Sequence, residues 1–74
     1  MNRTEAHAAY LRLLMDRVRQ DHYPSTTHMS LIEQSLPPQL IPDYVEILIE
    51  KCSQDRNPSI SMLSRIGRLV GQAR

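Results

Sequence analysis

Apolar residues recur along this chain at the spacing of one helix face, in four stretches separated by short polar segments. This pattern predicts an all-α protein. The first helix is expected over about residues 4–19 and the second over about 26–36. The third is expected from residue 42, after a loose or 3₁₀ turn at 38–41. The fourth is expected over about residues 60–72.

A six-residue segment occurs twice, thirty-four positions apart: Gln20–Ser25 reads Gln-Asp-His-Tyr-Pro-Ser and Gln54–Ser59 reads Gln-Asp-Arg-Asn-Pro-Ser. Aligning residues 10–36 with 44–70 gives eight identities and matching apolar positions. The period equals that of tetratricopeptide repeats, but the Trp, Leu-Gly, Ala and Phe positions of that family have no counterparts. We therefore expect one helical hairpin written twice and closed into a four-helix bundle. This predicts a single domain, residues 1–74, with hairpin 1 over about 4–36 and hairpin 2 over about 38–72.

The repeated segments have the residues of a helix-stopping turn followed by a helix start. Proline restricts the residue before it to extended backbone, which ends the preceding helix. Ser25 and Ser59 follow the prolines and are favourable N-caps, and Asp21 and Asp55 can accept bonds from nearby backbone N–H groups. These segments are therefore interpreted as turns and not as binding sites.

The core is expected to form from the matching apolar positions of the two hairpins. Cys52 aligns with Val18, so it is expected to be a buried, inert side chain. Gly67 lowers helix stability and is interpreted as a mark of close helix approach. The expected core residues are Leu11, Leu14, Met15, Val18, Met29, Ile32, Leu36, Val45, Leu48, Ile49, Cys52, Leu63, Ile66 and Val70, with Met62 and Leu69 beside them.

A second apolar pair lies off the main face of the first and third helices. Tyr10 and Leu13 form this pair in the first copy, and Tyr44 and Ile47 form it at the matching positions of the second. Two explanations are open: the pairs pack the hairpins together within one chain, or they form a homodimer interface. The chain is short and has no Phe or Trp, so its core is small, and association would bury additional apolar surface. The homodimer is therefore the leading hypothesis, with these four residues as its candidate interface.

Composition excludes several other kinds of function. Nine basic and eight acidic residues leave a net charge of +1, too little to indicate a membrane or nucleic-acid partner by charge. The single cysteine forms no internal disulfide, and the three scattered histidines form no metal-ligand pattern. No catalytic or cofactor motif occurs, so neither catalysis nor a cofactor is expected. The absence of a signal peptide or apolar spanning run favours the cytoplasm.

The sequence therefore favours a small, non-enzymatic protein–protein interaction module that self-associates and holds a protein partner not identified by the sequence. The alternative is a small helix-turn-helix DNA-binding regulator. In it, Arg65 and Arg68 of the fourth helix would contact bases or phosphates. The positions that match them in the first copy, Leu31 and Gln34, are not basic, and the low net charge also disfavours this alternative.

Overall fold

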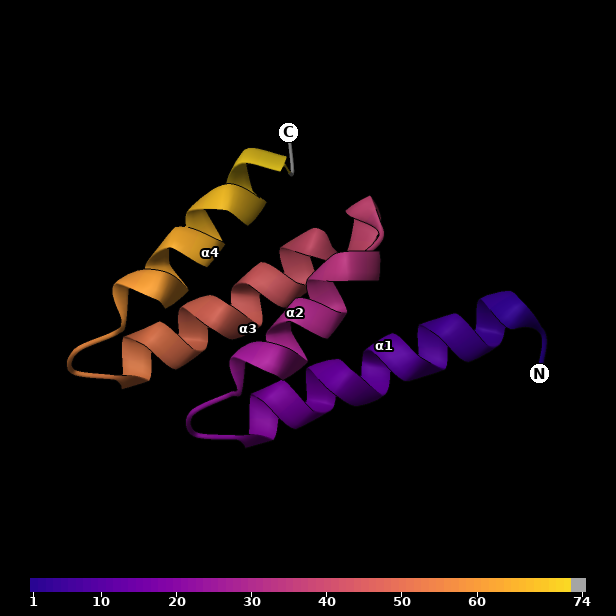
Figure 1. Cartoon of the computed structure of the whole chain (residues 1–74), viewed down its shortest axis with the longest axis horizontal. Helices are drawn as coiled ribbons and strands as arrows, with labels where there is room; N and C mark the ends of the chain where they lie inside the picture. Colours follow the sequence, from indigo (N-terminus) through magenta and orange to yellow (C-terminus); the bar gives the residue numbers. More distant parts are fainter. Residues whose placement is uncertain (73–74) are drawn as a thin grey trace. The chain divides into compact units, whose positions relative to one another are not determined.

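The computed structural model describes residues 1–72 of the chain, and these form four α-helices, one short 3₁₀ helix and no strand (Figure 1). The all-α prediction is confirmed, and the helix boundaries lie within one or two residues of those expected. The 3₁₀ turn expected before the third helix is also present. The elements are α1 (Arg3–Gln20), α2 (Thr26–Ser35), η1 (Pro38–Leu40), α3 (Ile41–Gln54) and α4 (Ile60–Gln72).

The chain divides into two compact units, Met1–Leu36 and Pro37–Arg74, and each contains one pair of helices. In the first unit α1 packs against α2, and in the second α3 packs against α4 and against η1. A five-residue segment joins the helices of each pair and reverses the chain direction (Figure 1). The two hairpins expected from the repeat are therefore present as separate pairs.

The serine of each repeated segment caps the helix that follows it. Ser25 Oγ accepts a hydrogen bond from the backbone N–H of His28 at 3.0 Å, and Ser59 Oγ accepts one from Met62 at 3.0 Å. Each bond satisfies one of the N–H groups that the first turn of a helix leaves without an intrahelical acceptor. The sequence expectation for both caps is confirmed.

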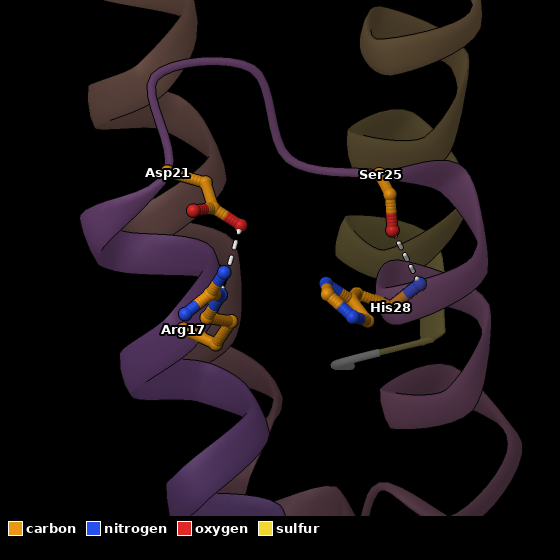
Figure 2. Close-up of polar contacts among 4 residues, drawn as sticks. All are labelled: Arg17, Asp21, Ser25 and His28. Atoms are coloured by element: carbon orange, nitrogen blue, oxygen red, sulfur yellow. Dashed lines mark hydrogen bonds and ion pairs between the residues drawn. The ribbon is translucent and has the colours of Figure 1, made fainter.

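The two aspartates of the repeated segments make different contacts. Asp55 Oδ1 accepts a hydrogen bond from the backbone N–H of Asn57 at 3.3 Å, as expected for an aspartate in a turn. Asp21 forms an ion pair with Arg17, one turn earlier in α1, with 3.5 Å between Asp21 Oδ2 and Arg17 Nε (Figure 2). The Arg17 side chain is mostly exposed, so this pair contributes little to stability.

In the first unit the expected core is present but short. Leu11 and Val18 of α1 and Met29 and Ile32 of α2 are buried. Leu14, Met15 and Leu36 are only partly buried. Leu14 and Met15 lie on either side of the line through Leu11 and Val18, at about 100° per residue, so α2 covers the centre of this face of α1 more fully than its edges. Leu36 follows the last residue of α2.

In the second unit α3 is the most deeply buried helix. Its expected core residues Val45 and Leu48 are buried, whereas Ile49 is exposed and Cys52 is partly exposed. Cys52 is therefore less buried than its alignment with Val18 predicts. The buried apolar residues of this unit are Ile41, Tyr44, Val45, Ile47 and Leu48 of α3 and Leu69 of α4.

The buried face of α4 differs from the predicted one, and this is the main correction to the sequence interpretation. Leu63 and Val70 were expected in the core, yet both are exposed, whereas Leu69 and Arg65 are buried. The buried face is rotated by roughly 100° from the predicted one, at about 100° per residue. Two apolar stripes at helical spacing run along α4, one through Met62 and Leu69 and one through Leu63 and Val70. Periodicity alone does not decide between them.

Gly67 does not mark a close helix approach within the chain. A Cβ atom added to it would meet no described atom within 4 Å, so its surface is open.

We predict that both serine caps stabilise the protein to a similar extent. Ser25→Ala and Ser59→Ala should each lower the free energy of unfolding by about 1 kcal/mol, because each leaves one N–H of a first helical turn without its acceptor. Urea denaturation followed by circular dichroism measures this loss. Ser64→Ala is the matched control, since Ser64 is exposed and lies inside α4. It should change the free energy by less than about 0.5 kcal/mol. Equal effects of all three substitutions would contradict the cap assignment.

Candidate interaction surfaces

The four residues of the candidate dimer interface lie in two different environments. Tyr10 and Leu13 are exposed, at 44% and 69% of their full areas, whereas Tyr44 and Ile47 are almost fully buried. The two apolar pairs are thus at matching positions in the sequence, but one pair is exposed and the other is buried. The structure leaves only Tyr10 and Leu13 of this set available to a partner.

The exposure of Tyr10 follows from the unequal lengths of α1 and α2. Every side chain from residue 1 to residue 10 is exposed. With eight residues more than α2, α1 is about 12 Å longer, at 1.5 Å per residue. Its N-terminal half extends past its partner helix (Figure 1). Apart from Met1 and Tyr10, the side chains of this segment are polar or those of alanine, so it offers little apolar area.

A second exposed apolar surface lies on α4. Ile60, Leu63 and Val70 are exposed at 81%, 48% and 52% of their full areas. Gly67 is also exposed and lies between Leu63 and Val70 on the same face of the helix. The steps between these four residues are three, four and three positions. This is the spacing of the a and d positions that face a partner helix in a coiled coil. We call these four residues the α4 seam.

The positions that flank the α4 seam carry no charge. Ser59 and Ile66 lie along one side of it and Ser64 and Gly71 along the other. A helix packed on the seam would therefore remove no ionised side chain from water at these positions. This matters because desolvating a charge costs several kcal/mol unless a partner compensates it.

The two arginines proposed as nucleic-acid contacts are also in different environments. Arg65 is 7% exposed and lies on the buried face of α4, whereas Arg68 is exposed. The pair does not form the exposed basic surface that binding to a phosphate backbone requires.

The polar groups at the loop end of the first unit do not form a metal site. His28 projects from α2 toward α1, on the side of Arg17 and Asp21 (Figure 2). His22 lies in the connecting loop and His7 in the exposed half of α1. Within residues 1–72, no three His, Cys, Asp or Glu side chains are grouped so as to hold a metal ion.

Sequence reasoning missed the α4 seam because it assigned Leu63 and Val70 to the core by alignment with Met29 and Leu36. The signal that identifies the seam is present in the sequence. Ile60, Leu63, Gly67 and Val70 follow the three-four-three spacing. Ile60 has a threonine at its matching position, so the alignment gave no reason to include it.

Cys52 is a free, partly exposed cysteine near the C-terminal end of α3. Burial raises the pKa of its thiol, and the negative charge of Asp55 raises it further. Both effects disfavour the thiolate, which is the reactive form. Partial exposure therefore does not make Cys52 a reactive thiol at neutral pH.

We predict that Asp55→Asn makes Cys52 more reactive. The substitution removes the negative charge while keeping an oxygen for the Asn57 N–H, so the pKa should fall and the thiolate fraction at a given pH should rise. The rate of iodoacetamide alkylation, measured against pH, should shift its midpoint downward. Asp21→Asn, the same change at the matching position, should leave the midpoint in place. A wild-type thiol that already reacts as fast as an unfolded one would contradict the stated protection.

No protein-family model, curated protein or solved structure matches this chain. None of the helices in residues 1–72 combines the length and the apolar character that crossing a bilayer requires. The functional interpretation therefore depends on the surfaces described above.

Proposed function

We propose that this protein is a small, non-enzymatic helical interaction module that self-associates. The observation that supports this most directly is the α4 seam, which places Ile60, Leu63 and Val70 in one exposed line. The proposed activity is binding. Two copies of the chain bind each other through the α4 seam, and the surface outside this contact binds a protein partner.

Single exposed apolar side chains are ordinary on protein surfaces and need no partner. The seam differs because its three large side chains lie on one face of one regular helix at the spacing of a helix–helix contact. Each Å² of apolar surface removed from water contributes about 25 cal/mol. One partner helix can therefore remove three large apolar side chains of the seam from water at once. It cannot do this for side chains that are exposed singly, such as Tyr23.

A second copy of this chain is the occupant that we propose. The chain has 74 residues and no Phe or Trp, and small domains with limited cores often gain burial by oligomerising. Two copies related by a twofold axis bring the same surface of each against the other, so one self-complementary patch is sufficient.

Several finer parts of the proposal rest on the sequence. The repeated segments support an internal duplication of one hairpin and closure of the two hairpins into a four-helix bundle, although the halves differ in helix length and in the face that α4 buries. One cysteine and no catalytic or cofactor motif support a cytoplasmic protein that works without a cofactor. A helix-turn-helix DNA-binding regulator ranks lower. Of the two arginines proposed to contact DNA, Arg65 is buried and Arg68 is exposed.

We predict that the wild-type protein forms a dimer whose population rises from micromolar to near-millimolar concentration. Leu63→Glu should abolish it, because the charge would have to be desolvated inside the interface. Sedimentation velocity ultracentrifugation measures the monomer and dimer populations. Leu13→Glu is the matched control, since Leu13 is also an exposed helical leucine. It should leave the dimer intact.

Three results would change this proposal. A wild type that stays monomeric at every concentration would contradict self-association. Loss of the dimer in Leu13→Glu alone would move the interface to α1, where the sequence pattern first placed it. A lower melting temperature of Leu63→Glu than of the wild type, measured by circular dichroism at a concentration where both are monomeric, would indicate that Leu63 packs within one chain.

A further inference from the structure

The side chains of the α4 seam alternate in a way that determines how two seams can fit together. Ile60 and Leu63 lie toward the N-terminus of the helix, and Gly67 and Val70 follow. No described atom approaches within 4 Å of a Cβ added to Gly67, so this position is an open notch in the seam. A partner helix must place a side chain there or leave a void.

The two possible directions of a partner helix fill that notch differently. In a parallel pair each residue meets its own copy, so Gly67 faces Gly67 and the layer contains no side chain. In an antiparallel pair centred near residue 65, Ile60 lies at the level of Val70 and Leu63 lies at the level of Gly67. Each layer then combines a larger side chain with a smaller one, and Leu63 of one copy occupies the notch of the other. Close packing without voids favours the antiparallel arrangement.

We propose that two copies of this protein pair through antiparallel α4 helices, with Leu63 of each copy seated on Gly67 of the other. This inference rests on the proposed self-association and specifies its geometry. Four layers form along the pair: Ile60 with Val70, Leu63 with Gly67, and the two symmetry-related layers.

The charges of α4 agree with this arrangement. The flanking positions Ser59, Ser64, Ile66 and Gly71 carry no charge, so neither copy places an ionised group in the contact. Antiparallel helices also place the positive end of each helix dipole beside the negative end of the other, whereas parallel helices place like ends together. Packing and electrostatics therefore both favour the antiparallel pair.

The area of the contact predicts a weak dimer. The seam offers three large apolar side chains per copy, whereas a standard stable interface buries about 1,200–2,000 Å² with some 20–30 residues from each partner. The pair should therefore exchange with monomer and depend strongly on protein concentration. Disulfide trapping under redox equilibrium is suited to such a complex, because it reports which residues meet in the associated state.

The experiment uses the full chain with Cys52→Val and one added cysteine per variant. An Ile60→Cys chain labelled with ¹⁵N is mixed with an unlabelled Val70→Cys chain in a glutathione buffer, and the disulfide-linked species are identified by mass. In the antiparallel pair, residue 60 of one copy faces residue 70 of the other, whereas the two residues 60 lie about 15 Å apart at 1.5 Å per residue. A disulfide spans at most about 7 Å between Cα atoms. The mixed disulfide should therefore exceed either self-disulfide by about tenfold.

The outcomes separate this inference from the proposed function. Predominant self-disulfides of Ile60→Cys and of Val70→Cys would show a parallel pair and would overturn the antiparallel inference alone. A Ser61→Cys chain is the control for random collision, because Ser61 is exposed on α4 outside the seam. If it cross-links as fast as the seam variants while the wild type dimerises, the dimer uses another surface. If the wild type does not dimerise in the ultracentrifuge, the proposed self-association itself fails.

Discussion

The structure depends on one constraint: each short helix pair buries only part of the apolar surface of its helices. The buried faces hold Leu, Ile, Val and Met side chains together with Tyr44 and Arg65. Other apolar residues stay at the surface. In α1 these are Tyr10 and Leu13, and in α4 they are the residues of the seam. The candidate surfaces are thus a direct consequence of how little each pair can cover.

The same constraint explains why two hairpins with similar sequence patterns have different surfaces. The repeated segments form turns of equal length, and Ser25 and Ser59 cap their helices in the same way. Beyond the turns, α4 is longer than α2 and buries Arg65, where the first copy has Leu31. Arg65 and Leu69 lie on the buried face of α4, and Leu63 and Val70 remain exposed. Residues at matching positions of the sequence therefore form a core stripe in one hairpin and a surface stripe in the other.

Much of this fold could be predicted from the sequence, because its strongest signals are local. Proline placement, serine caps and helical periodicity specified the four helices and the 3₁₀ turn to within one or two residues. The residues of the candidate site could not be predicted equally well. Which stripe of α4 is buried depends on tertiary packing, and its two stripes have the same period. The alignment of the copies carried Met29 and Leu36 onto Leu63 and Val70, and Tyr10 onto Tyr44, although their environments differ.

The central claim is that the α4 seam is the surface through which copies of this chain meet. Amide chemical shifts of the ¹⁵N-labelled wild type, recorded by NMR from micromolar to millimolar concentration, test it without any substitution. The account predicts progressive shifts at Ile60, Leu63, Gly67 and Val70, with Tyr10 and Leu13 unchanged. Shifts confined to Tyr10 and Leu13, or no shifts at any concentration, would contradict it.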